Sequence, residues 1–465
     1  MALARTQVPN NTTHRPATIQ RVRIGATKDG KILAIAHENW SGNLHGFREE
    51  RSGAQTRLLY AGANRLVTHK LATLDLPEGN AMRAPGEAVG HLSLEVAMDE
   101  LAERLNLDPV QLRILNDTQH DPEKGPERPF SSRKLVECLR EGAQKFGWAQ
   151  RNPKPGQVRE GHWQIGLGVA SALRNNPTLA SAARVRIDKK GHITVETDMT
   201  DIGTGSYTVL AQTAAEMMGV PLHQVTVKLA ESHYPQSCGS GGQFGGNSST
   251  SGVYAACVLL RSKLAQQAGW DPVATTFENG KMSSAGQSKS LAEAAGPKGL
   301  SAEDKIDFGD SQKKWAQASF GAHFVEVAVH RVSGETRVRR ALGVFAAGRI
   351  LNPKTARSQL LGAMAMGIGG ALCEELVVDK RFGYFVNHDL AEYHVPVHAD
   401  IPHTEIIMLE ELDDKSSPMK AKGVGELGIC GIGAAVCNAI YNATGIRLRD
   451  YPFTPDKLVA RLPSL

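Results

Sequence analysis

The chain of 465 residues is long enough for about three domains, and an apolar fraction of 41% can fill their cores. Lysine and arginine number 53 against 48 aspartates and glutamates, and the charges are interspersed rather than gathered in basic blocks, which argues against a nucleic-acid partner. The six cysteines include no C-x-x-C pair, so their spacing favours neither a disulfide framework nor a zinc or iron–sulfur site.

The sequence offers neither a membrane span nor an export signal. No apolar run approaches the roughly 20 residues of a spanning helix. Residues 1–16 carry polar side chains where a signal peptide needs an apolar core. By its own sequence we expect a cytoplasmic protein with no membrane span, for which a periplasmic location would depend on co-export with a partner that bears a signal.

Three segments share a pattern of β-branched alternation, a turn dipeptide and a second alternating run, which is typical of β-hairpins. They are 19–35, 183–195 and 324–344, with turns at Asp29-Gly30, Lys190-Gly191 and Ser333-Gly334. We expect each hairpin to be part of a larger sheet.

Helices are predicted between these hairpins. The clearest periodicity runs over 93–105, followed by Asp108 at an N-cap position and Pro109 at a first helical position. His323, at the start of a predicted strand, is expected to pack in the core. Further helices are expected at 209–218, 253–265 and 434–441. The mixture predicts an α+β fold with mixed sheets and packed helices.

Two segments with few apolar residues suggest how the chain is divided. Residues 152–161 are rich in proline and glycine, which suits a domain boundary, and 281–304 are rich in Ser, Ala, Gly and Lys, which suits an exposed insertion. We therefore predict a first domain at 1–150 and a second at 151–465 that contains the insertion.

Four glycine-rich stretches adjoin or lie within predicted helices, at 203–206, 239–246, 367–370 and 423–433. Bare amides at helix N-termini bind anions. Each stretch alone is typical of a turn or a tight helix contact, but four in one chain predict a long, phosphate-bearing cofactor held mostly by backbone. The P-loop pattern G-x-x-x-x-G-K-[ST] does not occur, which disfavours a nucleoside triphosphatase.

The segment 422–428 reads Lys-Gly-Val-Gly-Glu-Leu-Gly and places the carboxylate of Glu426 among glycines. Because glycine has no Cβ, a ligand can approach the backbone closely, and the carboxylate can act as a general base. The alternative is a plain glycine-rich turn before a helix. The glycines also fit G-x-G-x-x-G, but polar residues at 413–418 separate them from the apolar run at 406–409, which disfavours a nicotinamide dinucleotide site.

Several motifs occur together in a fixed order: Arg15-Pro16-Ala17-Thr18, 81–87, 95–102 with Asp108-Pro109, 241–245, 348–353 with Gln359, and 422–426. In this order they resemble the molybdenum-binding subunit of the xanthine oxidase and aldehyde oxidase family, most closely the large subunit of bacterial three-subunit aldehyde oxidoreductases. The resemblance implies an α+β fold with a two-part molybdenum-cofactor-binding domain.

The resemblance also implies a cofactor and its contacts. The cofactor is expected to be molybdopterin cytosine dinucleotide, with molybdenum held by the pterin dithiolene, so that no protein side chain ligates the metal. The catalytic base of the family matches Glu426. Arg174 could direct its guanidinium at a substrate carbonyl or carboxylate, with a surface ion pair as the alternative. Cofactor contacts are expected from Arg83, Gly203, Thr204, Gly205, Ser206, Gly241, Gly242, Gln243, Phe244, Gly245, Gln359, Gly367, Lys422, Gly423, Val424 and Gly425.

The implied activity is oxidation of aldehydes to carboxylic acids with water as the oxygen source, and the alternative substrate class is N-heterocycles. The upstream glycine-phenylalanine loop of the family is absent from the 465 residues, so we expect the first domain to be truncated. The alternative to an active enzyme is a non-catalytic remnant of such a subunit. No iron–sulfur spacing or convincing flavin fingerprint is present. We therefore expect 2Fe-2S and FAD on partner chains, an iron–sulfur subunit and a flavin subunit.

Overall fold

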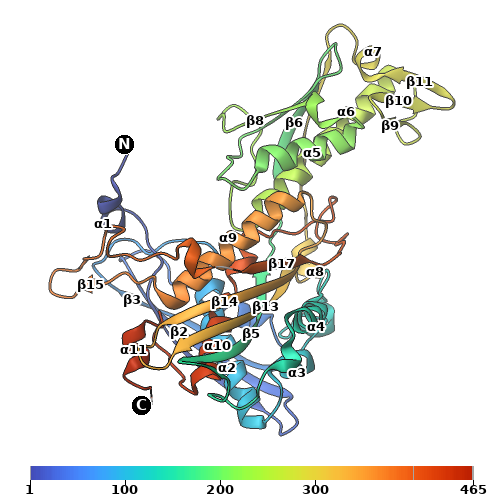
Figure 1. Cartoon of the computed structure of the whole chain (residues 1–465). Helices are drawn as coiled ribbons and strands as arrows, with labels where there is room; N and C mark the ends of the chain where they lie inside the picture. Colours follow the sequence, from blue (N-terminus) through green and yellow to red (C-terminus); the bar gives the residue numbers. More distant parts are fainter. Residues whose placement is uncertain (1, 402, 463–465) are drawn as a thin grey trace.

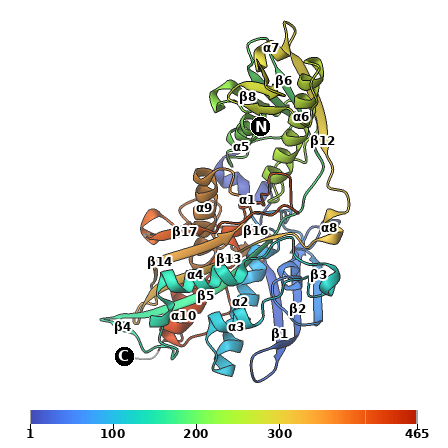
Figure 2. The ribbon, with the colours of Figure 1, turned by 90° about the vertical axis from the view of Figure 1, so that its right-hand side faces the viewer.

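A computed structural model describes residues 2–401 and 403–462 of the chain. Figure 1 shows a larger body and a smaller lobe, drawn in green and yellow, that projects from one end of the body. The view turned by 90° in Figure 2 shows the same division. The lobe is formed by residues 181–306, and the body by the segments before and after it.

A five-stranded sheet forms the centre of the body. Its strand order is β17-β14-β13-β5-β4, with β14 and β17 parallel and the other neighbours antiparallel. The bounds are β4 Arg159–Glu160, β5 Trp163–Asn175, β13 Ala318–His330, β14 Thr336–Ala346 and β17 Thr404–Met408.

Helices cover both faces of this central sheet. On β13, Val327 belongs to the same apolar cluster as α10 (Ile432–Thr444), whereas Phe324 packs with α4 (Leu135–Phe146). Since alternate side chains of a strand point to opposite faces, the two helices lie on opposite sides of the sheet. The strands are therefore apolar on both faces.

The N-terminal part of the body is a three-stranded sheet of order β1-β2-β3 with a helical cover. Its first two strands form an antiparallel hairpin and its third strand runs parallel to the second. Asp108 caps the second helix by accepting hydrogen bonds from the amides of Val110 and Gln111. The bounds are β1 Thr18–Ala26, β2 Ile32–Asn43, β3 Asn64–Thr73, α2 Glu87–Leu105 and α3 Pro109–Leu115.

The lobe packs two long helices on a four-stranded sheet of order β12-β6-β7-β8. A three-stranded sheet of order β11-β10-β9 extends it. The bounds are β6 Ser181–Ile187, β7 Ile193–Thr197, α5 Ser206–Met218, β8 Val225–Leu229, α6 Gly245–Gln267, β9 Thr276–Glu278, β10 Lys281–Ser284, β11 Gln287–Ser290, α7 Leu291–Ala295 and β12 Leu300–Ile306.

The remaining elements are one long helix and short connecting pieces. They are α9 Pro353–Leu372, α1 Val8–Asn11, α8 Ser311–Lys314, β15 Val378–Asp379, β16 Tyr384–Phe385, α11 Pro455–Val459, and the 3-10 turns η1 Arg5–Gln7, η2 Ala54–Arg57, η3 Gly125–Glu127, η4 Trp148–Gln150, η5 Leu222–Gln224, η6 His398–Asp400 and η7 Leu427–Ile429.

The α+β architecture and the three predicted hairpins are confirmed. Helices α5 and α6 begin earlier than predicted, because their first turns are made of the glycines and hydroxyl residues that we assigned to loops. The segment 281–304, predicted to be an exposed insertion, has many exposed residues, but part of it belongs to the core of the lobe. Its Met282 and Leu291 are buried in the lobe, and β12 pairs with β6 at the edge of the four-stranded sheet.

The segment 427–444 is long and apolar enough to cross a membrane by length and composition, with a mean hydropathy of 1.3 over 18 residues. It comprises η7 and α10. Since 89% of it is buried inside the protein, where α10 lies against β5 and β13, its apolar character is explained by its place in the core.

The contact between α10 and β5 requires glycine at position 168. A Cβ there would lie 2.1 Å from the Ala435 carbonyl oxygen and 2.3 Å from the Ala439 amide nitrogen. Gly168→Ala should therefore lower the free energy of unfolding by about 1–3 kcal/mol. Gly370→Ala in α9, where a Cβ meets nothing within 4 Å, is the control and should stabilise by at most ~1 kcal/mol. Urea unfolding measures both, and equal stabilities would contradict the packing argument.

Candidate functional site

A cavity of about 520 Å³ lies where the lobe meets the body, a size typical of a cofactor or small-molecule site. From the lobe it is lined by Met199, Ile202, Thr204, Ser206, Val209, Ser240, Gly241, Gly242, Gln243, Gly245, Gly246 and Asn247. From the body it is lined by Arg83, Arg349, Ile350, Leu351, Asn352, Thr355, Ala356, Gln359 and residues 421–426.

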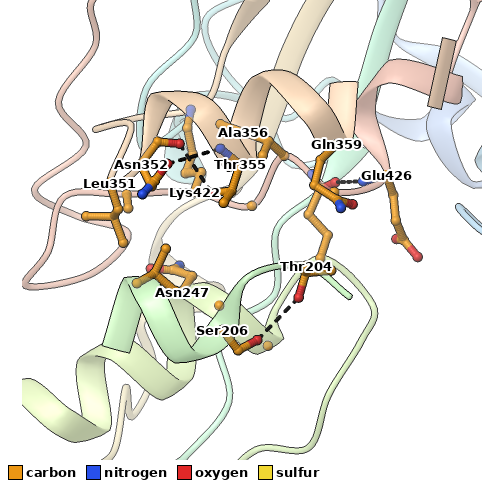
Figure 3. Close-up of a pocket in the computed structure, with 18 of the residues that line it drawn as sticks. Thr204, Ser206, Asn247, Leu351, Asn352, Thr355, Ala356, Gln359, Lys422 and Glu426 are labelled. Carbon is orange, nitrogen blue, oxygen red and sulfur yellow. Dashed lines mark hydrogen bonds between the residues drawn. The ribbon is translucent and has the colours of Figure 1, made fainter. Parts of the chain in front are cut away.

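Helices α5, α6 and α9 all begin at this cavity. Ser206, Asn247 and Thr355 lie in their respective first turns, and Figure 3 shows the three side chains on facing walls. Asn352 caps α9 by accepting a hydrogen bond of 3.0 Å from the Thr355 amide, and Pro353 fills the first helical position. The positive end of a helix dipole favours anions. The cavity therefore suits a ligand that bears phosphate groups.

Two buried side chains of the cavity wall leave polar atoms for such a ligand. Gln243 Nε2 and Asn247 Oδ1 are buried and have no hydrogen-bond partner within residues 2–401 and 403–462. A buried polar atom without a partner costs free energy unless a ligand or water satisfies it. Gln243 also has a φ of +64°, a strained conformation for a residue with a Cβ. The residues present therefore fit a large polar cofactor.

Glycines whose backbone is not covered by side chains form another part of the cavity wall. A Cβ added at Gly241 or Gly246 would meet nothing within 4 Å, and one at Gly425 would approach only Gln359 Oε1, at 3.6 Å. The glycines at these positions thus keep open space rather than permit a tight internal contact. Such space lets a ligand approach the backbone amides closely.

The loop 421–426 that carries Glu426 forms one wall of the cavity and is held mainly by side chains from other elements. The Gly423 amide donates to Asn176 Oδ1 at 2.8 Å, and the Gly423 carbonyl accepts from Ser319 Oγ at 2.8 Å. The Glu426 amide donates to Gln243 Oε1 at 3.1 Å. The position of the loop is thereby tied to both the central sheet and the lobe.

Arg83 also holds this loop. Its Nε donates to the Gly425 carbonyl at 2.8 Å, and its Nη2 donates to the Gln359 carbonyl at 2.8 Å. Burial lowers the pKa of Arg83 and the nearby Glu426 carboxylate opposes that shift. The guanidinium therefore fixes the cavity wall, while Arg83 itself lines the cavity.

Glu426 lies at one end of the cavity and is paired with a buried arginine. Arg174 Nε and Nη2 contact Glu426 Oε2 at 2.7 and 2.6 Å, and Arg174 Nη1 donates to Glu87 Oε1 at 2.8 Å. Burial lowers the pKa of Arg174, but Glu87 and Glu426 outweigh burial and raise it above its ordinary value. Arg174 is therefore a buried bridge between two carboxylates and not a surface ion pair. Figure 3 shows Glu426 beyond Gln359, with Leu351 and Asn352 at the other end of the group.

Most of the predicted cofactor contacts line the cavity, and four do not. Gly203 and Gly205 shape the turn before α5, with φ of +95° and +85°, and the Phe244 ring packs over the Cα of Gly242. Gly367 lies away from the cavity in α9, where a Cβ would be 2.2 Å from Ile432 Cγ2, so it permits close contact with α10. Of α9 only Gln359 was predicted, whereas Asn352 and Thr355 at its start were not, although an Asn-Pro pair at 352–353 is a helix-start signal.

His323 and four of the six cysteines are buried in the protein interior. His323 is fully buried, its Nε2 lies 2.9 Å from the Cys430 carbonyl oxygen, and burial lowers its pKa to about 3, which confirms its predicted place in the core. Cys138, Cys257, Cys430 and Cys437 are buried. Within the described part of the chain, no group of three His, Cys, Asp or Glu side chains is placed to hold a metal ion.

Comparisons with known proteins identify the type of domain. Sequence models of the molybdopterin cofactor-binding domain match residues 1–117 and 141–402. The chain is 62% identical over 463 residues to the aldehyde oxidoreductase molybdenum-binding subunit PaoC of Escherichia coli (strain K12), a match that covers 100% of this chain and 63% of that protein. The chain thus spans less than two thirds of the length of this curated relative.

Solved structures show the same fold. Quinoline 2-oxidoreductase from Pseudomonas putida 86 matches with a TM-score of 0.86 and 24% identity, over 99% of this chain and 64% of that chain. Aldehyde oxidoreductase from Desulfovibrio desulfuricans ATCC 27774 matches with a TM-score of 0.82 and 23% identity, over 99% of this chain and 50% of that chain. The predicted resemblance and the predicted two-part molybdenum-cofactor-binding fold are confirmed. The predicted division at residue 150 remains a prediction.

The bridge between Glu87 and Glu426 predicts a pH-dependent effect on stability. Burial raises the pKa of Glu87 above its ordinary value of 4.5, although Arg174 opposes the shift. As pH rises past 4.5, Glu87 loses its proton in the unfolded chain but keeps it in the folded chain. The free energy of unfolding of the wild type therefore falls with rising pH until the pH passes the raised pKa of Glu87. Glu87→Gln, which mimics the protonated form, should match the wild type at about pH 3.5 and be the more stable at about pH 7. Urea unfolding over a pH series measures this difference, and a pH-independent difference would refute it.

Proposed function

Since the chain belongs to the molybdopterin-binding proteins of the xanthine oxidase family, we propose that it is the molybdenum-binding part of an enzyme that oxidises aldehydes to carboxylic acids. The observation that carries the proposal is Glu426: a carboxylate held by Arg174 at the end of a cavity that suits the cofactor. The name of the Escherichia coli relative supports aldehydes as the substrate class.

The cofactor we propose is the cytosine dinucleotide form of molybdopterin. Its phosphate groups would be held at the N-termini of α5, α6 and α9, where Ser206 and Thr355 add hydroxyl donors. The side-chain Nε2 of Gln243 and the uncovered backbone at Gly425 would hold the part of the cofactor next to Glu426. When bound, the cofactor supplies the two-electron oxidation of the substrate.

Glu426 would act as the general base. The overall reaction converts an aldehyde and water into a carboxylic acid, two protons and two electrons. Its Oε2 is held by Arg174, whereas its Oε1 accepts no hydrogen bond from the described residues and is free to take a proton from the water-derived hydroxyl that attacks the carbonyl carbon. Arg174 thereby orients the base, and since it is not among the residues that line the cavity we assign it no contact with the substrate.

The two electrons must leave the site for turnover to continue. We propose that they pass to partner chains, an iron–sulfur subunit with 2Fe-2S clusters and a flavin subunit with FAD. The Escherichia coli relative is itself named as a subunit, which supports an assembly of several chains.

Glu426→Gln tests the proposed base. The amide keeps the size of the side chain and loses the proton acceptor, so aldehyde turnover should fall by ~10²–10⁴ while molybdenum stays bound. Dye-coupled aldehyde oxidation and metal analysis on the same preparation measure the two quantities. Glu405→Gln, at an exposed position on β17, is the matched control and should turn over like the wild type. Near-normal turnover in a molybdenum-loaded Glu426→Gln protein would contradict the assignment.

Gly425→Val tests the proposed place of the cofactor. The nearest atom to a Cβ at this position is 3.6 Å away, so the protein should fold with the melting temperature of the wild type freed of its cofactor. The added methyl groups would occupy the open space of the cavity, so molybdenum and cytidine nucleotide content should both fall. A folded variant with full cofactor content would show that the cavity is not the binding site.

A further inference from the structure

The side chain of Lys422 is fully buried and does not serve the cavity that its backbone lines. Its side chain has an exposed fraction of 0%, as does that of Asp413, and that of Glu411 is 2%. In Figure 3 the Lys422 side chain runs away from Asn247 and Ser206 on the opposite wall. The prediction that Lys422 contacts the cofactor can therefore hold for its backbone, whereas its ammonium has other partners.

The ammonium of Lys422 lies among buried polar groups from three segments of the body. It donates to Ser132 Oγ at 2.8 Å and to the Ala318 carbonyl at 3.0 Å, and it lies 3.2 Å from Glu411 Oε2 and 3.8 Å from Asp413 Oδ2. A buried ammonium is stable only when it is paired and its donors are satisfied. The three N–H donors all find acceptors here.

The two carboxylates are in turn fixed by the surrounding structure. Asp413 Oδ2 accepts from Ser131 Oγ at 2.6 Å and from Ser132 Oγ at 3.0 Å. Glu411 Oε2 accepts from the Gly348 amide at 2.5 Å. The acceptors that hold the lysine are therefore themselves immobile, and removal of the lysine would leave two buried carboxylates without a cation.

This cluster is connected to the proposed base through a short backbone segment. Lys422 also donates its amide to the Ala347 carbonyl at 2.9 Å, and the next residue, Gly423, makes the bonds to the central sheet. Glu426 follows after Val424 and Gly425. Since the intervening segment has no helical or strand hydrogen bonds, its position depends on the residues that anchor it.

We propose that Lys422 is a positioning residue for Glu426. Its ammonium, held between Glu411, Asp413 and Ser132, anchors the start of the loop so that the carboxylate stays aligned at the end of the cavity. The catalytic part of this inference rests on the proposed function of Glu426, whereas the anchoring part does not.

Lys422→Met tests both parts, with Lys420→Met as the matched control. Lys420 lies in the same loop and is exposed. Hydrogen–deuterium exchange of the peptide 421–430 should be faster in Lys422→Met than in the wild type and unchanged in Lys420→Met. With a dye as electron acceptor, kcat per molybdenum should fall about 10²-fold in Lys422→Met at unchanged KM, because a misplaced base affects the transition state and not substrate binding.

Separate outcomes would overturn the inference. Wild-type exchange and wild-type kcat in Lys422→Met would show that the ammonium anchors nothing. Loss of molybdenum in proportion to activity, with normal turnover per molybdenum, would make Lys422 a cofactor-binding residue instead. If the molybdenum-loaded wild type oxidises no aldehyde, the proposed function fails while the exchange measurement still tests the anchoring.

Ser132→Ala covers the case in which Lys422→Met does not fold. It removes one acceptor of the ammonium and one donor to Asp413 without leaving a charge unpaired. We expect faster exchange of the peptide 421–430 and a smaller fall in kcat, again at unchanged KM. A folded Ser132→Ala protein with wild-type exchange and wild-type kcat would overturn the proposal.

Discussion

The site depends on the loop 421–426, whose position is fixed by contacts with other segments of the chain. Residues 421–426 adopt neither helix nor strand, yet they run through a largely buried region where backbone donors and acceptors need partners. Those partners come from elsewhere: Asn176 directly after β5, Ser319 from β13, Gln243 from the lobe and Arg83 from the segment before α2. The loop is therefore held by both the lobe and the body, and the cavity and Glu426 lie at their junction.

Buried charge is the second organising feature. Arg174 is placed between Glu87 and Glu426, and Lys422 lies between Glu411 and Asp413, so each buried cation faces two carboxylates. Burial raises the pKa of Glu87, and the guanidinium of Arg174 opposes that shift. The attraction within a buried ion pair offsets only part of the cost of removing its charges from water. These clusters therefore specify the geometry of the loop more than they add to overall stability.

Sequence reasoning reached the local features and missed those set by tertiary contacts. The hairpins and the Asp108 cap follow from patterns within a few residues. Gly367 shows what a sequence pattern does not reveal. A sequence does not distinguish a glycine that leaves space for a ligand from one that admits a neighbouring side chain, here Ile432. Arg174 and Glu426 are 252 positions apart, so their ion pair could not be predicted from spacing. Gln359 of α9 was predicted, but the first turn of this helix was missed because the Asn352 cap says where a helix starts and not what it faces.

We propose that the cofactor lies in the cavity between lobe and body with its metal beside Glu426. Crystals of the cofactor-loaded protein, measured at the molybdenum absorption edge, would locate the metal. We expect an anomalous peak inside the cavity, at the Glu426 end and close to Gln243. A peak outside the cavity, or at the opposite end beside Leu351 and Asn352, would contradict it.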